Sequence, residues 1–401
     1  MDNILGVHNC YGCGVCAKVC GKNLIALRLN EDGFYEPFIE DVDRCASCGL
    51  CVQVCSYCDD SLAIDRSVRE SYAAWSNDTK VLNKCSSGGI AFEIAKLLIE
   101  DGYNVCAVKY NAAENRAEHF IAHNKEELIQ SAGSKYLQSY TIPGFLQIDK
   151  KKKYLVTGTP CQIDSFRRYI KFFRCEDNFV LLDFFCHGVP SMLMWKKYLN
   201  IIEKKTGKIY YASWRNKQTG WHDSWTMTAD GELNGVPIDW HDSYNMLIRE
   251  KKSYYNSRLS EGDLFYKMFL RNTCLGKACY DHCKYKMTKS SADIRVGDLW
   301  GKTYSKNQAG VSGVLVFTER GESVIQRLKQ NNICSFTSVD SNIVMEGQMK
   351  EPAKKSLFWM SINKKLKTDA SLNCIAWHYL YIIQFVSFVM RVLNKFKRMV
   401  K

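Results

Sequence analysis

Proline is scarce in this sequence, and several patterns typical of processed or modular chains are missing. Only six of the 401 residues are proline, so no proline-rich linker marks a domain boundary, and neither repeats nor low-complexity tracts occur. The first residues, MDNILGVHNC, lack the basic and apolar regions of a secretory signal. Without a helix-turn-helix, RNP-like or zinc-finger pattern, nucleic acid is not an expected partner. The polar stretch 59–71 is the expected hinge.

Cysteine, by contrast, is abundant, and its spacing is that of metal ligands. The chain has 19 cysteines, and eight of them form two runs of four, CYGCGVCAKVC at 10–20 and CASCGLCVQVC at 45–55. In bacterial two-cluster ferredoxins, three cysteines of a run ligate one 4Fe–4S cluster and the fourth ligates the other cluster. The predicted ligands are Cys10, Cys13, Cys16 and Cys55 for one cluster, and Cys45, Cys48, Cys51 and Cys20 for the second.

The segment between the two runs supports this layout. Residues 24–39 alternate apolar and polar side chains around an Asp-Gly turn, which predicts a hairpin. Zinc is the alternative metal, because paired CxxC elements also form zinc sites, although the doubled four-cysteine spacing is much more specific. Cys58 lies just beyond the second run and is a spare thiol in this pattern.

Charge is unevenly distributed along the chain. Residues 1–62 contain four Lys/Arg and nine Asp/Glu, a net charge of −5, so the rest carries +18 of the total of +13. A basic body favours anionic partners such as nucleotide cofactors, phosphorylated substrates, other ferredoxins or anionic lipid. An ordinary solvated surface is the alternative. Oxygen-sensitive clusters belong in a reducing compartment, so we expect a cytoplasmic protein.

The body of the chain has an α/β pattern with cysteines at strand ends. A strand at 154–157 leads into a helix with Cys161 in its first turn, and the next apolar strand ends at Cys186. Strand, helix and strand over about thirty residues predict a βαβ unit, whose ligands bind beyond the carboxyl ends of the strands. Both cysteines should face that crevice, with buried core thiols as the alternative. Two of Cys274, Cys279 and Cys283 would complete a third cluster.

Anion-binding groups are also expected near this crevice. The Ser-Ser-Gly-Gly turn at 86–89 precedes an amphipathic helix at 90–100, and glycines at a helix N-terminus let backbone N–H groups approach a phosphate. An ordinary serine N-cap is the alternative. For docking of an anionic substrate or cofactor, the basic candidates are Arg215, Lys217 and the run Lys150–Lys153.

A series of motifs in the body resembles a known family. The motifs are, in order, CSSGG, GSKYLQS, VTGTPCQ, FCHGVPS, SWRNKQTGW and ADIRVGDLWG, behind the ferredoxin-like start. Together they resemble the beta-subunit family of deazaflavin (coenzyme F-420) hydrogenases and dehydrogenases over roughly residues 1–330. Family members serve hydrogenases, formate dehydrogenases and sulfite reductases, and one is a chlorophyll-modifying reductase. Many stand-alone bacterial copies, some beside polysaccharide-synthesis genes, have no established substrate.

The resemblance implies FAD and a 4Fe–4S cluster beside it in the body. The implied third-cluster ligands are Cys161, Cys186, Cys279 and Cys283, although the family's cysteine pair is more closely spaced than in this chain. Lys135 is expected near a phosphate or the flavin ring, and no catalytic residue is assigned. The expected flavin contacts are Ser86, Ser87, Gly88, Gly89, Ser134, Lys135, Tyr136, Gln138, Ser139, Thr157, Gly158, Thr159 and Pro160.

The C-terminal tail differs in character from the body. Residues 374–393 are mostly apolar, yet a polar stripe at helical spacing favours a helix lying in a membrane interface over one crossing the bilayer. Packing against the body or another subunit is the alternative. The stripe consists of Gln384, Ser387, Arg391, Lys395 and Arg398.

The expected fold class is an α+β ferredoxin domain followed by an α/β, mixed-sheet, flavin-binding body that contains a βαβ unit. The expected domains are a two-cluster ferredoxin at 1–62, a flavin-binding N-terminal family part at 70–145, a C-terminal family part with flavin and the third cluster at 146–345, and a basic amphipathic tail at 346–401.

The expected function is that of an iron–sulfur flavoprotein oxidoreductase in polysaccharide or other anaerobic metabolism. Electrons would move between a ferredoxin-type donor and a two-electron partner through FAD. The expected partners are an external ferredoxin or deazaflavin, a catalytic partner subunit, and the inner face of the membrane through the tail, with a homo-oligomer left open. One alternative is an electron-transfer subunit without its own substrate. The other is a regulatory or nucleic-acid-binding protein with structural clusters.

Overall fold

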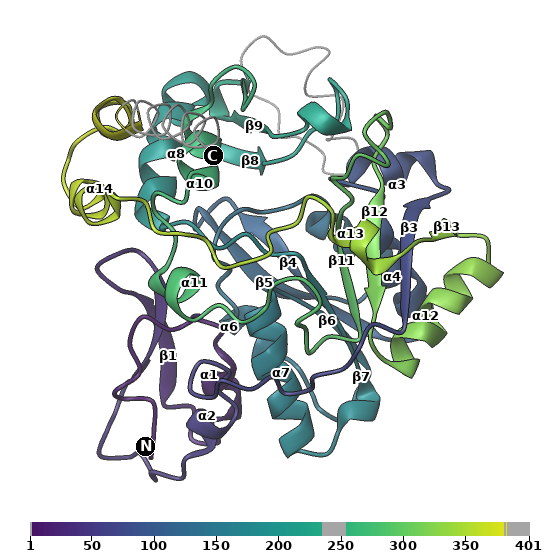
Figure 1. Cartoon of the computed structure of the whole chain (residues 1–401). Coiled ribbons are helices and arrows are strands. Elements are labelled where there is room, and N and C mark those ends of the chain that lie inside the picture. Colours follow the sequence, from purple (N-terminus) through teal and green to yellow (C-terminus); the bar gives the residue numbers. More distant parts are fainter. Residues whose placement is uncertain (1, 235–253, 381, 383–401) are drawn as a thin grey trace, which may run out of the picture.

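The chain forms an N-terminal two-helix and hairpin region, a central eight-stranded sheet and a smaller three-stranded sheet (Figure 1). The computed structural model describes residues 2–234, 254–380 and 382. The N-terminal region, purple in Figure 1, lies against one side of the body. The small sheet, with β8 and β9, lies at the other end of the view.

The N-terminal region consists of two short helices and a hairpin. Strands β1 (Ile25–Leu29) and β2 (Tyr35–Ile39) pair antiparallel, which confirms the predicted hairpin. Helices α1 (Val15–Val19) and α2 (Leu50–Gln53) each follow a glycine with positive φ, Gly14 at 73° and Gly49 at 75°. Glycine adopts this left-handed conformation without steric cost, so each cysteine loop can turn sharply into its helix.

The central sheet is mixed, with the strand order β13-β3-β12-β11-β7-β6-β4-β5. Strands β4, β6, β7 and β11 run parallel, and the remaining neighbours pair antiparallel. The predicted βαβ unit is confirmed as β6, α7 and β7. The strands are β3 (Glu70–Ser76), β4 (Asn104–Asn111), β5 (Arg116–Ala122), β6 (Tyr154–Thr157), β7 (Phe179–Phe184), β11 (Ile294–Asp298), β12 (Ser312–Val316) and β13 (Cys334–Ser338).

Helices cover both faces of this sheet. Apolar side chains of α4 (Ile90–Glu100) and α12 (Glu319–Gln330) form one buried cluster with the inward side chains of the strands. On the other face, α7 (Pro160–Phe172) and α6 (Ile142–Phe145) share a second cluster with apolar residues of the N-terminal region. The N-terminal region therefore packs onto the body through a continuous core. Shorter helices are α3 (Thr79–Lys84), α5 (Lys125–Leu128) and α13 (Ser341–Met345).

The small sheet lies beyond the carboxyl ends of the parallel strands. Its order is β10-β9-β8, and it packs with nearby helices around a third, aromatic-rich core. Arg215, just after β8, bonds to Asp298 at the end of β11, so this layer covers the strand-end edge. The elements are α8 (Met192–Thr206), β8 (Ile209–Ser213), β9 (Thr226–Gly231), β10 (Tyr255–Arg258), α10 (Leu264–Leu270), α11 (Lys277–Asp281) and α14 (Trp359–Leu366).

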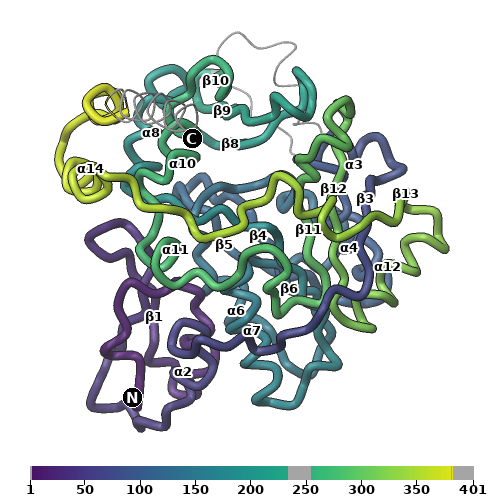
Figure 2. The backbone as a smooth tube through the Cα atoms, in the orientation of Figure 1, coloured from purple at the N-terminus to yellow at the C-terminus, as the bar shows by residue number. Residues whose placement is uncertain are grey.

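The segment expected to be a hinge is held against the body by hydrogen bonds. Residues 59–69 run across the molecule from α2 to β3, as the tube in Figure 2 shows. Arg168 donates to the Asp59 carboxylate at 2.6 Å, and the Ala63 amide donates to Asp164 at 2.7 Å. Charged groups of the body therefore hold the linker in place. The polar sequence of the linker did not indicate these contacts.

The tail begins by packing on the body. Leu372, Ile375 and Leu380 are buried in the aromatic-rich core, and Arg271 donates to the Leu380 carbonyl at 3.3 Å. The predicted polar stripe from Gln384 to Arg398 lies outside the described residues. Over the ranges that the structure covers, no helix is long and apolar enough to cross a membrane.

Candidate iron–sulfur and cofactor site

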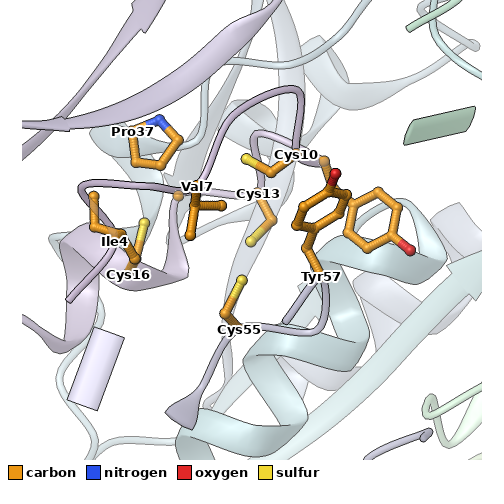
Figure 3. Close-up of a pocket in the computed structure, with 10 residues that line it drawn as sticks. Ile4, Val7, Cys10, Cys13, Cys16, Pro37, Cys55 and Tyr57 are labelled. Carbon is orange, nitrogen blue, oxygen red and sulfur yellow. The ribbon is translucent and has the colours of Figure 1, made fainter. Parts of the chain in front are cut away.

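Four of the predicted ligands line one pocket, and we call them the proximal group: Cys10, Cys13, Cys16 and Cys55. The rest of the lining is Ile4, Val7, Tyr11, Gly14, Pro37 and Tyr57, and Figure 3 shows the thiols around one space. Burial raises the pKa of Cys16 well above its usual range, and its cysteine neighbours raise it further. Such crowded thiols become thiolates readily only when a metal compensates the charge. The donor set therefore fits a 4Fe–4S cluster.

The distal group consists of Cys20, Cys45, Cys48 and Cys51, at the outer end of the N-terminal region. Cys51 is buried and Cys48 is exposed. Burial raises the pKa of Cys51, and the neighbouring Cys48 adds to this rise. Cys20 and Cys45 pack against the same apolar core as Cys51. This arrangement fits a second cluster close to the surface.

The body group consists of Cys161, Cys186, Cys279 and Cys283, which meet beyond the ends of β6 and β7. Burial raises the pKa of Cys161, and the thiols of Cys186 and Cys279 raise it further. The Cys283 thiol likewise raises the pKa of Cys186. The four thiols are therefore close enough to affect one another's pKa, although they come from three separate segments.

Cys274, the other candidate, has a different environment. It is fully buried, and its Sγ lies 3.1 Å from the Met194 Sδ in the aromatic-rich core. This contact is typical of a core thiol.

Zinc and a 4Fe–4S cluster require different spacings of their thiol ligands. In the part of the chain that the structure covers, no group of three or more His, Cys, Asp or Glu side chains is placed to hold a single metal ion. A zinc site gathers its ligands tightly, with Zn–S distances of about 2.3 Å. A cubane instead binds one thiolate at each of its four iron corners, so its ligands lie farther apart.

The proximal and body groups are joined through α7. Cys161 lies in the first turn of α7, and Ser165, one turn later, places its Oγ 3.3 Å from the Cys13 Sγ. Ser165 also bonds to Ser56, whose Oγ donates to the Cys161 carbonyl at 3.1 Å. The Tyr11 hydroxyl lies beside the body group. Burial raises the pKa of Tyr11, and the nearby thiols of Cys161, Cys283 and Cys279 raise it further.

The predicted flavin contacts gather partly at the strand-end edge. The Ser134 amide donates to the Ser86 Oγ at 2.9 Å, and Arg215 donates to the Tyr136 hydroxyl at 3.2 Å. Arg215 also donates to the Ser86 carbonyl at 3.1 Å. Two chain segments that the resemblance assigned to flavin binding therefore meet at the edge where α/β sheets bind ligands.

The turn 86–89 is itself tightly packed. The Ser87 hydroxyl donates to the Val311 carbonyl at 2.8 Å, and the Gly88 amide donates to the Ser312 Oγ at 3.0 Å. A Cβ on Gly88 would lie 2.3 Å from the Ala74 carbonyl oxygen, so only glycine fits there. Gly89, with φ of 85°, precedes α4, which has no side-chain cap. The turn thus packs against the end of β3 and the start of β12.

Several other residues expected to contact flavin form hydrogen bonds to groups of the protein. Lys135 donates to the carbonyls of residues 130–133, and burial lowers its pKa to about 7. Its approach to a phosphate would require these bonds to rearrange. Gln138 donates to the Tyr11 carbonyl at 3.1 Å and accepts from the Tyr35 amide at 2.7 Å, so it joins the body to the hairpin region. Ser139 accepts from Gln162 at 3.0 Å.

The turn before α7 also has defined partners. Thr159 forms a capping box with Gln162, and Pro160 occupies the first turn of the helix. The Thr159 Oγ1 lies 3.2 Å from the Cys161 Sγ. Thr157 donates to the Cys106 carbonyl, and the Gly158 amide donates to the Leu182 carbonyl. These four residues border the body group, and their flavin contacts stay predictions.

The expected basic docking residues differ in exposure: Arg215 is buried, Lys217 is half-buried and the run Lys150–Lys153 is exposed. Arg215 is fully buried and pairs with both carboxylate oxygens of Asp298 at 2.8 and 3.1 Å. The Lys217 ammonium donates to three backbone carbonyls, and burial lowers its pKa to about 8. The run Lys150–Lys153 precedes β6 and therefore lies at the opposite edge of the sheet. Tertiary partners, absent from any local pattern, determine these positions.

Two features of the site were not assigned from the sequence. Asp298, in the RVGDLWG motif, accepts from Trp221 as well as Arg215, and Trp221 stacks on Trp300 at 4.9 Å. Lys286 donates to the Cys186 carbonyl at 2.6 Å and places a positive charge beside the body group. The motif itself could have indicated Asp298, whereas the position of Lys286 has no local signal.

Comparisons with known proteins match three segments of the chain. Residues 71–146 match the N-terminal part of the family described as "Coenzyme F420 hydrogenase/dehydrogenase, beta subunit", and residues 151–342 match the C-terminal part of the same family. Residues 9–57 match a "4Fe-4S dicluster domain". The coenzyme F420 hydrogenase subunit beta of Methanococcus voltae is 23% identical over 287 residues, which cover 68% of this chain and 86% of that protein.

Among solved structures, the chain is similar to one in the F420-reducing NiFe hydrogenase complex from Methanosarcina barkeri. The TM-score is 0.45 at 15% identity, and the match covers 80% of this chain and 94% of that one.

Proposed function

Since the chain belongs to the coenzyme F420 hydrogenase/dehydrogenase beta-subunit family and begins with a 4Fe–4S dicluster domain, we propose that it is an iron–sulfur flavoprotein oxidoreductase. It moves electrons between a ferredoxin-type donor and a two-electron partner. Members of this family bind FAD, which when bound converts between one-electron and two-electron transfer. The substrate, and a setting in polysaccharide or other anaerobic metabolism, remain predictions.

The contact between the proximal and body groups carries this proposal. Cys13 and Cys161 are linked through Ser165 and Ser56, which all lie within one buried hydrogen-bonded set. Three cysteine groups thus follow one another from the surface to the strand-end edge. Structural clusters in a regulatory protein have no need for such a succession, whereas electron transfer requires it.

The protein groups around the body centre hold the ligands and exclude water. The four thiols are only partly accessible, and Lys286 and Arg295 bring positive charge toward Cys186. Positive charge near a cluster favours its reduced form. Arg295 is itself held by a fully buried ion pair with Asp183 at 2.7 Å, so its position is fixed.

Iron content tests the three-cluster assignment. Anaerobically purified protein should hold about twelve irons with matching sulfide, and Cys161→Ala should lose up to about four of them. Cys274→Ala is the matched control, because its thiol is buried in the apolar core and should leave the iron content unchanged. Eight irons in the intact protein, unchanged in Cys161→Ala, would rule out the third cluster.

Flavin release tests the FAD assignment. The intact protein should release FAD on denaturation, and Lys135→Ala should hold less of it, because the Lys135 ammonium orders the turn before Ser134. Lys125→Ala, which removes only an exposed ion pair with Glu100, is the control. Absorbance and fluorescence of the filtrate give the FAD content. A colourless filtrate from fully reconstituted protein would contradict the flavoprotein assignment.

A second candidate function is that of an electron-transfer subunit for a separate catalytic partner. The curated relative is itself named a hydrogenase subunit, which favours this alternative. The two functions differ in one measurable property. An enzyme with its own substrate reacts with a soluble two-electron partner when isolated, whereas a subunit of this kind does so only in its complex.

A further inference from the structure

The four thiols of the body group are not equally well fixed by secondary structure. Cys161 lies in the first turn of α7, Cys186 follows directly after β7, and Cys279 lies within α11. Cys283 lies just beyond the end of α11, in residues 282–285, which form neither helix nor strand. The position of Cys283 therefore depends on contacts that other parts of the chain make with this short segment.

One of these contacts comes from the loop that carries the proximal group. Tyr11 lies between Cys10 and Gly12 in that loop, and it lines the proximal pocket. The Tyr11 hydroxyl donates a hydrogen bond to the carbonyl of His282, the residue next to Cys283. A single side chain thus contacts both the proximal pocket and the segment of a body thiol.

Tyr11 is itself held by the surrounding structure. Gln138 donates to the Tyr11 carbonyl at 3.1 Å, which fixes the backbone of the loop. The Tyr11 ring packs edge-on against Tyr57 at 5.3 Å and against Tyr285 at 5.8 Å. Edge-on packing is a favourable arrangement of aromatic rings. The hydroxyl is therefore kept in place to bond to the His282 carbonyl.

The residue on the other side of Cys283 is also held by the N-terminal part of the chain. The Lys284 ammonium donates to the carbonyls of Ser56 and Ser61 at 2.9 and 2.7 Å. Both neighbours of Cys283 are thus bonded to residues that precede the central sheet. Of the two contacts, only that of Tyr11 starts between two ligands of the proximal group.

We propose that Tyr11 is a positioning residue of the body cluster, which holds Cys283 in place from the loop of the proximal group. The proposal rests on the proposed function, because it requires a cluster at the body group. Loss of the hydroxyl would leave all four thiols present but one of them less firmly placed. The body cluster should then still assemble, but it should give up its iron more easily.

The variant Tyr11→Phe tests this role, because it keeps the ring and removes the hydrogen bond. Anaerobic protein is mixed with the ferrous chelator bathophenanthroline disulfonate, and the absorbance of the chelate follows iron release. About four irons, those of one cluster, should be released severalfold faster than from the intact protein. Electron paramagnetic resonance of samples frozen during release should show the body cluster signal disappearing first. That signal is identified by its absence from Cys161→Ala.

Tyr57→Phe is the matched control within the same group of rings. The Tyr57 ring packs against His282 at 4.9 Å, but among the residues that the structure describes its hydroxyl has no hydrogen-bond partner. Tyr57→Phe should therefore release iron as the intact protein does. The spectrum of the reduced body cluster should change in Tyr11→Phe and stay unchanged in Tyr57→Phe, because only the first substitution alters the segment of a ligand.

The outcomes separate this proposal from the function on which it rests. An intact protein without a body cluster would overturn the third cluster of the proposed function. A body cluster that is as stable in Tyr11→Phe as in the intact protein would overturn only the role of Tyr11. Equal acceleration in Tyr11→Phe and Tyr57→Phe, or acceleration at all three clusters of Tyr11→Phe, would show a general loss of packing and would also overturn it.

Discussion

At the scale of single residues, the Ser165 hydroxyl lies between the proximal group and the helix turn that carries Cys161. It lies 3.3 Å from the Cys13 Sγ, and the Ser56 amide donates to it at 3.1 Å. Ser165 is buried, so water does not compete for its bonds. When Cys13 ligates iron as a thiolate, the serine hydroxyl becomes the donor in this contact. Hydrogen bonds to cluster sulfurs raise the reduction potential, because they stabilise the more negative reduced state.

Replacing this serine should therefore shift one potential. Ser165→Ala should make the reduction potential of the proximal cluster more negative by on the order of 40 mV, the equivalent of one hydrogen bond of about 1 kcal/mol in a one-electron couple. A redox titration followed by electron paramagnetic resonance measures the change. The distal cluster of the same sample is the internal control, since it lies away from Ser165. Equal shifts of both potentials would contradict a local role for this hydroxyl.

At the scale of elements, helix α7 organises the junction between the two parts of the chain. Its first turn carries Cys161, and its next turn presents Asp164 and Ser165. The Asp164 carboxylate accepts from the Ala63 amide and from the Tyr285 hydroxyl at 2.9 Å, so it holds both the linker and the segment after the body cysteines. One helix thus positions a predicted ligand, the linker and the contact to the proximal group.

The same elements show which features local sequence can predict. The hairpin at 24–39 and the unit of β6, α7 and β7 depend on alternation and turn residues within a short stretch, so both could be predicted. The four cysteines that line the proximal pocket were also grouped from their spacing in the sequence. Gln138 was expected to contact flavin, yet it binds Tyr11, 127 positions away. The role of a polar side chain is decided by partners distant in sequence, and for this reason the bonds of Arg215 to Asp298 and of Lys217 to backbone carbonyls could not be predicted locally.

At the scale of the whole molecule, the N-terminal region is fixed against the body. The hairpin turn at Asp32 and Gly33 docks on the start of α8, where the Met192 amide donates to the Gly33 carbonyl at 2.9 Å. A Cβ on Gly33 would lie 2.7 Å from the Ser191 Oγ, so the close approach requires glycine. Lys367 also pairs with Asp32 at 2.7 Å. The proposed electron transfer between the two parts would therefore require no movement of a domain.

If electrons pass through the centres in a fixed order, removal of the last centre and removal of the first centre should block different steps of electron transfer. In the proposed order, the distal group comes first, the proximal group follows, and the body group comes last, beside the strand-end edge. In Cys161→Ala, a reduced ferredoxin should still reduce the two N-terminal clusters, but the flavin should stay oxidised. In Cys48→Ala, a hydride donor such as reduced deazaflavin should still reduce the flavin, the body cluster and the proximal cluster. Reduction by ferredoxin should then be slow, because the outermost centre is missing.

Stopped-flow spectra that follow flavin and cluster bleaching separately distinguish these cases. Cys374→Ala, which removes an exposed thiol of the tail, should behave as the intact protein does. If the flavin of Cys161→Ala is reduced by ferredoxin at the normal rate, electrons do not pass through the body group, and the proposed order is wrong. If the intact protein reacts with ferredoxin but with no soluble two-electron partner, the order stands. The chain then acts as the electron-transfer subunit of a separate catalytic partner.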